Sequence, residues 1–305
     1  MRNSLEVSVV IPTCNSKDQI IGTLSSVVGQ DTDFEFNVVI IDYGSTDGTL
    51  NVIKRVQRSD NRVNLYEIPH KNFSHSGTRN LAASKTESRF IVFITADALP
   101  ADRYWLRNLI KPFDLDEKIA GVFGCHLPYP SCFPLTARDI RNHMEGFNNH
   151  PNVVWMEDIE RYSHDLGYKQ FLHFYSDNNS CMRRDVWKKI PYPPVEWGED
   201  QCWAKAIIEA GYKKAYAPDA CVYHSHNYSF FERIRRFKVE REFWFKEFGY
   251  KGINTLWNLL YETFNSTRID CKWWKKEYNS ITVGAFIKII FHNLSRFIGD
   301  YLGGF

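Results

Sequence analysis

The sequence predicts an α/β protein with a mostly parallel sheet flanked by helices, followed by a C-terminal helical extension. Three observations support this class. Short apolar runs alternate with helical stretches over residues 1–125, a pattern typical of parallel strand pairing. The runs lack polar alternation, as expected for strands covered by helices on both faces. From Ser229 onward, the composition changes to basic and aromatic segments with helical spacing.

Strands are expected where β-branched and aromatic residues form short apolar runs with polar boundaries. These runs are residues 7–13, 36–42, 62–68, 89–95 and 119–125. Helical spacing of apolar residues predicts helices between them. The predicted helices cover residues 17–29, a stretch from about Asp47, and Ser76 to Ser84. With 305 residues and 44% hydrophobic content, the chain is long enough to bury a large core.

Residues 126–180 are rich in Pro, His, Asn and aromatic side chains, and their periodicity is weak. We expect long loops with one or two helices there, and such loops commonly build the substrate site of α/β enzymes. Regular structure is expected to return near Met182, and residues 200–210 have a helical pattern.

Polar residues follow three of the predicted strands. Pro12-Thr13-Cys14-Asn15 end the first strand, Asp42 to Gly48 end the second, and Thr95-Ala96-Asp97 end the fourth. The carboxyl ends of parallel strands meet at one edge of a sheet, where ligands bind. A carboxylate after an apolar strand is costly unless it is compensated, and Mg²⁺ or Mn²⁺ would compensate it. The alternative for Asp97 is an N-cap of a helix at residues 100–110.

Two further segments carry candidate catalytic or metal-binding side chains. Glu199 and Asp200 open a predicted helix, whose dipole favours acids. The loop before them would place both acids on an exposed rim, where a general base could act. His224 and His226 are two residues apart, so on a strand they would face the same side and could bind a divalent metal. Ordinary histidines on a strand edge are the alternative.

The ordinary phosphate-binding loops are missing, because the sequence contains neither GxGxxG nor GxxxxGK[ST]. A phosphate would therefore need a metal and basic side chains. Arg79, at the start of a predicted helix, is a candidate, and an arginine on the helix surface is the simpler interpretation.

Composition excludes several classes of protein. The net charge of +2 does not indicate nucleic-acid binding. Seven cysteines without CxxC spacing indicate reduced thiols in a cytosolic protein, and not a disulfide framework or a zinc site. No signal peptide is visible, and no apolar stretch reaches the ~18 residues of a membrane span. Residues 281–305 are amphipathic, which fits a packed helix or a helix lying on a membrane surface.

Four motifs, in order, resemble those of glycosyltransferase family 2, the inverting enzymes with the GT-A fold. VSVVIPTCN is similar to the opening strand of the family, and VVIIDYGSTDGT is similar to its V-D-D-G-S-x-D motif, with Tyr43 in place of the second acid. ITADALP is similar to the metal-binding D-x-D segment, and WGEDQCWAKAIIEAGY to the segment that carries the catalytic base. The resemblance covers residues 7 to about 240 and implies a Rossmann-like GT-A sheet.

A narrower resemblance points to the bacterial rhamnosyltransferase branch. It rests on NFSHSGTRNLAA, TADALPAD, AGVFGCHLPYP, NNSCMRRDVW and VYHSHNYS. Ser76, Ala96 and Cys125-His126 depart from the pattern of the branch, at positions near the expected sugar pocket. The branch implies transfer of L-rhamnose from dTDP-β-L-rhamnose to a surface polysaccharide such as O-antigen or capsule. The alternatives are a UDP-hexose or UDP-N-acetylhexosamine transferase, a non-catalytic nucleotide-sugar binding module, and a nucleotidyltransferase.

The family resemblance also implies a role for each matching position. The nucleotide-sugar would be held by Pro12, Thr13, Asn15, Asp42, Ser45, Asp47, Arg79, Thr95 and Ala96. Mg²⁺ or Mn²⁺ would be bound by Asp97 and His224. Asp200 would be the base that deprotonates the acceptor hydroxyl, with Glu199 beside it.

The resemblance further implies a catalytic domain at residues 1–228, with a nucleotide-binding half up to about residue 125 and an acceptor half after it. The remaining residues, 229–305, would form a helical region. Its basic and aromatic side chains suit peripheral attachment to the cytoplasmic face of the inner membrane, and a solvated helix face is the alternative. These side chains are Arg233, Arg235, Arg236, Lys238, Trp273, Trp274, Lys275 and Lys276. The expected acceptor is a glycan, free or lipid-linked, and the expected location is the cytoplasm.

Overall fold

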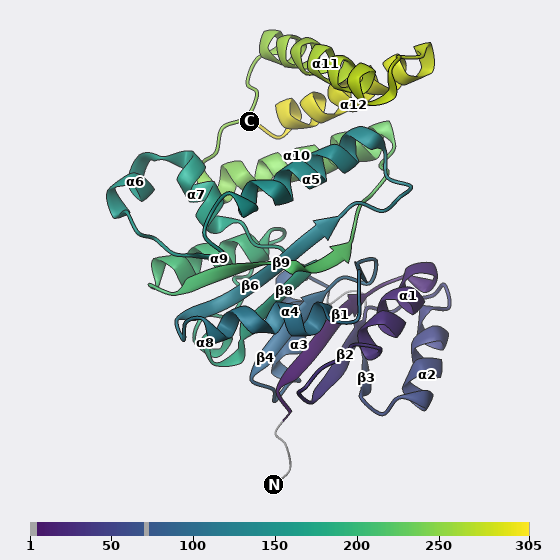
Figure 1. The fold of residues 1–305 in the computed structure, drawn as a ribbon, viewed down its shortest axis with the longest axis vertical. Coiled ribbons are helices and arrows are strands. Elements are labelled where there is room, and N and C mark those ends of the chain that lie inside the picture. The colour runs from purple at the N-terminus through teal and green to yellow at the C-terminus, as the bar shows by residue number, and fades with distance from the viewer. Residues whose placement is uncertain (1–4, 70–72, 305) are drawn as a thin grey trace. The chain divides into compact units, whose positions relative to one another are not determined.

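A computed structural model of the chain describes residues 5–69 and 73–304 (Figure 1). Its internal contacts divide the chain into two compact units. Unit 1 comprises Met1–Pro130 and Ala137–Ser225, and unit 2 comprises Ser131–Thr136 and His226–Phe305.

Unit 1 is built on one mixed sheet, whose strands follow the order β3-β2-β1-β4-β8-β6-β9-β5, with β7 also paired to β9. The first four strands in this order are parallel to one another, and β8 runs antiparallel to both of its neighbours. The bounds are β1 Val7–Thr13, β2 Phe36–Asp42, β3 Val63–Glu67, β4 Phe90–Ile94, β5 Leu99–Pro100, β6 Ile119–Leu127, β7 Val153–Val154, β8 Asn179–Arg183 and β9 Lys213–Tyr223. The five predicted strands are therefore confirmed, and β4 lies inside the sheet between β1 and β8.

Helices cover both faces of this sheet (Figure 1). Their bounds are α1 Lys17–Val28, α2 Thr49–Ser59, α3 His75–Ser84, α4 Trp105–Ile110, α5 Pro134–Asn148, α6 Ile159–His164, α7 Leu166–His173, α8 Arg184–Lys189 and α9 Glu199–Glu209, with a 3₁₀ turn at Lys111–Asp114. The prediction for residues 126–180 is wrong in one respect, because α5, α6 and α7 all lie there. The helices α6 and α7 have only 6 and 8 residues, too few to show a helical period clearly. The longer α5 packs on the sheet through buried side chains such as Phe147, which contacts Phe123.

The apolar strand runs are explained by two cores, one on each face of the sheet. Val92 and Ile94 of β4 join the core that includes residues of α1 and α4. Ile91 and Phe93 join the opposite core, together with Trp203 of α9. Alternate side chains of a strand point to opposite faces, so a strand buried on both sides must be apolar throughout.

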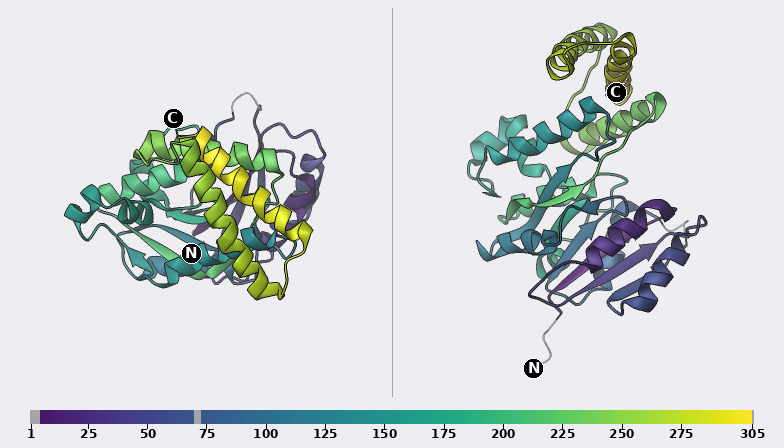
Figure 2. Two further views of the ribbon diagram at one scale, coloured as in Figure 1. Left: turned by 90° about the horizontal axis from the view of Figure 1, so that it is seen from above. Right: turned by 45° about the vertical axis from the view of Figure 1, so that its right-hand side comes forward.

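Unit 2 contains three long helices, α10 Phe230–Phe248, α11 Leu256–Tyr278 and α12 Val283–Leu302. Ser229 and Glu232 form a capping box at the start of α10. Gly299 allows α12 to approach α10 closely, since a Cβ atom there would lie 2.6 Å from the Ile234 carbonyl oxygen. The helices α11 and α12 run side by side (left panel of Figure 2). Among the described residues, none of these helices is both long and apolar enough to cross a membrane.

Candidate active site

The carboxyl ends of β1 and β2 form the first part of the site. Thr13 and Asp42 are register partners at these ends, and Pro12 precedes Thr13 on β1. The Asp42 side chain is fully buried and accepts hydrogen bonds from the backbone N–H of Ser45 at 2.9 Å and from its hydroxyl at 2.5 Å. The sequence-predicted residues Thr13, Asp42 and Ser45 therefore lie together.

Asn15 connects the two loops that follow β1 and β2. Its backbone N–H donates to the Ser45 hydroxyl at 2.8 Å, and its side-chain oxygen accepts from the Thr46 N–H at 2.9 Å. Asn15 has a φ of 47°, in the left-handed region that asparagine tolerates better than most residues. We refer to Asn15, Asp42, Ser45 and Asp47 as the donor-end cluster.

Asp47 belongs to this cluster as a helix-capping residue. Its carboxylate accepts from the N–H groups of Lys17 at 3.1 Å and Thr49 at 2.9 Å, at the first residues of α1 and α2. A hydrogen bond from the Thr49 hydroxyl is the largest cause that lowers the pKa of Asp47. Its position therefore follows from the loop that it fixes.

Asp97 and His224 form the second part of the site. Asp97 follows β4 after Thr95 and Ala96, and its Oδ2 lies 3.7 Å from Nε2 of His224. The backbone oxygen of Asp97 accepts a hydrogen bond from the Tyr129 hydroxyl at 3.0 Å, and the Ala96 oxygen accepts one from the Thr23 hydroxyl at 2.8 Å. The prediction that these two candidate metal ligands meet is supported by this geometry.

A buried cluster of charges forms the third part. The Arg79 guanidinium, 8% exposed, pairs with Glu199 and, at 3.1 Å, with Asp177. Asp177 also accepts a hydrogen bond from the Ser180 hydroxyl at 2.6 Å. Burial raises the pKa of both carboxyl groups, and the Arg79 charge opposes that rise. We refer to Arg79, Asp177, Glu199 and Asp200 as the base-end cluster.

Asp200 occupies the first turn of α9, directly after Glu199. Gly198 precedes them with a φ of 72°, in the left-handed region that favours glycine, and this turn directs the chain into the helix. Burial raises the pKa of Asp200 to about 8, and the negative charges of Asp177 and Glu199 add to the rise. A carboxyl group with a pKa near the working pH is suited to take a proton.

The segment Asp177-Asn178 joins the candidate metal-ligand pair to the base-end cluster. The Asn178 amide lies 3.5 Å from Nδ1 of His224, and the Asp177 backbone N–H donates to the Asp200 carboxylate at 3.2 Å. Asp97, His224 and Asp200 are thus connected through two adjacent residues that directly precede β8.

Two sequence-based expectations for these residues, the exposed rim at Glu199 and the strand position of the histidines, are wrong, and two alternative interpretations, a surface Arg79 and an N-cap at Asp97, are excluded. Glu199 does not lie on an exposed rim, because it is 4% exposed and paired with Arg79. Arg79 is buried by the same pair and is not a surface arginine. The two histidines do not lie on a strand, since β9 ends at Tyr223. Asp97 is not an N-cap, because α4 begins at Trp105.

Sequence reasoning missed Asp177 and Tyr129. Asp177 is 1% exposed, although it is an acid, and its only visible signal is its place just before the NNSCM strand segment. Tyr129 lies in the PYP segment after β6 and reaches Asp97 only through the fold. Both residues come from the stretch that the sequence left without clear periodicity.

The atoms offered by Asp97 and His224 fit a divalent cation. A carboxylate oxygen and an imidazole nitrogen are ligands that Mn²⁺ accepts, and the carboxylate also suits Mg²⁺. The Asp97 side chain is 34% exposed and the His224 side chain is 14% exposed, so both remain accessible to solvent and to a ligand.

These features define a sheet-edge enzyme site of the glycosyltransferase class. The family model described as "Glycosyl transferase family 2" matches residues 8–190, so the chain belongs to glycosyltransferase family 2. This finding confirms the predicted family and the predicted enzyme class.

Two curated relatives match most of the chain. The O-antigen chain rhamnosyltransferase RfbN of Salmonella typhimurium is 33% identical over 238 residues, which are 76% of this chain and 70% of the relative. The O-antigen chain rhamnosyltransferase WbaN of Salmonella anatum is 31% identical over 235 residues, 75% of this chain and 69% of the relative.

Solved structures confirm the GT-A fold. The mannosyltransferase PcManGT of Pyrobaculum calidifontis, solved with GDP-Man and Mn²⁺, superposes with a TM-score of 0.58 at 21% identity. The match covers 77% of this chain and 62% of that enzyme. Residues 1–349 of Staphylococcus aureus TarS, solved with UDP-GlcNAc, give a TM-score of 0.55 at 18% identity, over 78% of this chain and 66% of TarS.

Proposed function

We propose that the protein is an inverting rhamnosyltransferase, which moves L-rhamnose from dTDP-β-L-rhamnose to a hydroxyl of a growing bacterial surface polysaccharide such as O-antigen or capsule. The observation that carries this proposal is the connection of Asp97 and His224 to Asp200 through Asp177-Asn178. The similarity to two O-antigen chain rhamnosyltransferases supports the choice of sugar.

The donor would lie along the carboxyl ends of β1, β2 and β4. The donor-end cluster, with Pro12 and Thr13, would hold the nucleoside, and Thr95 and Ala96 would lie beside the diphosphate. Arg79 is proposed to act on the donor indirectly, because its guanidinium already pairs with Glu199 and Asp177 and fixes the position of the base.

Asp97 and His224 would hold Mg²⁺ or Mn²⁺. When bound, the cation supplies positive charge that stabilises the leaving diphosphate. The neighbouring side chains keep the two ligands in place, with Tyr129 fixing the backbone at Asp97 and Asn178 lying against the His224 ring.

Asp200 would act as the general base. As the acceptor oxygen attacks the anomeric carbon of the sugar, its proton passes to the Asp200 carboxylate. The bond from the anomeric carbon to the diphosphate oxygen breaks, and dTDP leaves. Because this is one displacement, the configuration inverts and the β-linked donor yields an α-L-rhamnoside.

The acceptor in this proposal is a lipid-linked glycan on the cytoplasmic face of the inner membrane, which the enzyme contacts peripherally. A UDP-hexose or UDP-N-acetylhexosamine donor is the second candidate, favoured by two residues that depart from the rhamnosyltransferase pattern. Ala96 directly precedes Asp97, and the His126 ring lies 5.8 Å from the His224 ring.

The proposal is tested by incubating the protein with Mn²⁺, a glycan acceptor and a panel of dTDP- and UDP-sugars. We expect turnover of dTDP-β-L-rhamnose with release of dTDP, and a loss of about 10³-fold or more in the Asp200→Asn variant, which should still bind dTDP. The matched control is Asp185→Asn, an exposed acid in the first turn of α8.

Three other outcomes would change the assignment of the donor, the reaction or the base. Turnover of UDP-sugars alone supports the second candidate, and release of pyrophosphate identifies a nucleotidyltransferase. Undiminished transfer by Asp200→Asn rejects the assignment of the base.

A further inference from the structure

An apolar surface covers the two C-terminal helices of unit 2. Of the large hydrophobic side chains on α11 and α12, twelve are 45–78% exposed. They are Leu256, Trp257, Leu260, Tyr261, Phe264, Ile269 and Tyr278 on α11, and Val283, Phe286, Ile287, Phe291 and Leu302 on α12. We refer to them as the hairpin face. Such a concentration of exposed apolar side chains marks an interaction surface.

Contacts outside the hairpin face also hold the two helices together. The contact between α11 and α12 includes a buried hydrogen bond of 2.7 Å from the Asn293 amide to Asp270. The Ile289 side chain is fully buried in the same unit. The hairpin therefore has its own internal contacts, and its face remains available to a partner.

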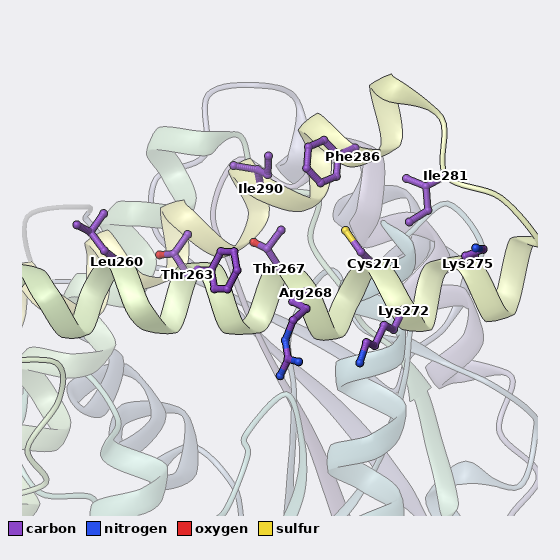
Figure 3. A pocket seen from close by; sticks show the side chains of 11 residues that line it. Leu260, Thr263, Thr267, Arg268, Cys271, Lys272, Lys275, Ile281, Phe286 and Ile290 are labelled. Atoms are coloured by element: carbon purple, nitrogen blue, oxygen red, sulfur yellow. The ribbon is translucent and has the colours of Figure 1, made fainter.

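A cavity of about 600 Å³ lies between α11 and α12. Its lining is almost entirely apolar on the side of α12, where Phe286 and Ile290 face α11, and Leu260 and Cys271 project toward them (Figure 3). Arg268, Lys272 and Lys275 of α11 also border this cavity. An apolar cavity beside three cations is complementary to a lipid that carries an acyl chain and a negative headgroup.

The charges of the sequence also point to an anionic partner, because the excess of basic side chains lies in the C-terminal helical region. Residues 229–305 contain 13 basic and 8 acidic side chains, whereas residues 1–228 contain 25 basic and 28 acidic ones. The helical region is thus positive, and the rest of the chain is negative. Positive charge next to an apolar helix face is characteristic of binding to anionic membrane surfaces.

We propose that the hairpin face binds the surface of an anionic phospholipid bilayer, with an acyl chain entering the cavity between α11 and α12. This inference deepens the peripheral membrane contact of the proposed function and specifies its surface and its lipid. Trp257, Tyr261 and Tyr278 belong to the residue types that settle at the membrane–water boundary, because they combine an apolar ring with a polar group. The basic side chains that border the cavity would form ion pairs with the lipid phosphates.

The test is flotation of the full-length protein with phosphatidylcholine vesicles that contain about one-third phosphatidylglycerol. We expect the wild type to float with these vesicles and to bind pure phosphatidylcholine at least about tenfold more weakly. Phe264→Glu/Phe286→Glu should lose at least about tenfold in affinity for the anionic vesicles, since two charges would enter the bilayer interface. Lys272→Glu/Lys275→Glu should lose binding to the anionic vesicles and keep the weak binding to phosphatidylcholine.

Two matched controls should bind as the wild type does. Leu115→Glu places a charge at a hydrophobic position of unit 1 that is 67% exposed. Lys188→Glu/Lys189→Glu reverses two exposed charges on α8. Both controls add negative charge to exposed positions of unit 1, outside the hairpin face.

Failure of the wild type to bind anionic vesicles overturns the inference, and so does undiminished binding by Phe264→Glu/Phe286→Glu. A wild-type dimer in light scattering that this variant converts to a monomer, without vesicle binding by either, identifies a second copy of the chain as the partner. Transfer to a water-soluble acceptor by Phe264→Glu/Phe286→Glu is measured in parallel, which separates failure of membrane binding from failure of the proposed reaction.

Discussion

The donor-end cluster and the base-end cluster of unit 1 are built from different interactions. At the donor end, Asp42, Ser45 and Asn15 form hydrogen bonds within and between the loops that follow two neighbouring strands, and Asp47 caps two helices. At the base end, a buried arginine pairs with two acids that come from distant parts of the chain. In the donor-end cluster, the side chains are fixed by hydrogen bonds from neutral donors and by turns. In the base-end cluster, they are fixed by the pairing of opposite buried charges.

This difference predicts unequal sensitivity to mutation. Removing one member of a buried charge cluster leaves the others uncompensated, whereas a lost hydroxyl in a partly exposed loop can be replaced by water. The proposed roles of the clusters differ in the same way, since only the proposed base requires a carboxyl group whose pKa lies near neutrality.

The largest effect on stability is expected for Arg79→Met. The variant leaves Glu199 and Asp177 buried without their cation, which should lower the free energy of unfolding by about 3–5 kcal/mol. Urea denaturation measures this change. Lys54→Met is the matched control, because the Lys54–Glu67 pair is about half exposed and should contribute less than about 1 kcal/mol. Equal losses in the two variants would contradict the contrast between buried and exposed pairs.

An intermediate effect is expected for Asp97→Asn. The amide keeps the shape of the side chain but loses the charge, so the affinity for Mn²⁺ should fall by at least about tenfold. Electron paramagnetic resonance of free Mn²⁺ during titration measures the affinity. Asp114→Asn, an exposed acid at the end of the 3₁₀ turn, should bind Mn²⁺ as the wild type does. If Asp97→Asn retains full affinity, the cation is held elsewhere.

The smallest effect is expected for Ser45→Ala at the donor end. The variant loses the hydroxyl that joins Asp42 to Asn15, while the Ser45 N–H still donates to Asp42, so the cost should be about 1 kcal/mol. Thermal unfolding and dTDP titration both report it. Ser59→Ala removes an exposed hydroxyl that donates to the Val56 carbonyl of its own helix and should change neither. A loss as large as that of Arg79→Met would mean that the donor end is not the more tolerant cluster.

Much of the fold could be predicted from the sequence, because its signals are local. Doubly buried strands such as β4 are apolar at every position, and turns such as Gly44 to Gly48 follow the strand that they end. The antiparallel direction of β8 could not be read, since NSCMR carries no mark of strand direction. Its pairing depends on packing between β4 and β6.

In the candidate site, too, the residues in local motifs could be predicted, and those whose positions depend on long-range packing could not. Asn15, Asp42 and Ser45 belong to two short motifs, so their proximity follows from two neighbouring parallel strands. The buried state of Arg79 and Glu199 arises from residues 120 positions apart, and neither position carries a local sign of burial. Asp177 was missed for the same reason, because its role depends on Arg79, Ser180 and the first turn of α9.

The most direct test of the base-end account is the pH dependence of kcat/KM for sugar transfer. Because burial and two neighbouring acids raise the pKa of Asp200 to about 8, and because a base acts in its deprotonated form, activity should rise with pH through a one-proton limb centred near that value. In Asp177→Asn, which removes one of those negative charges, the limb should move to lower pH. A wild-type profile that is flat between about pH 6 and 9, or a limb that stays in place in Asp177→Asn, would contradict the assignment.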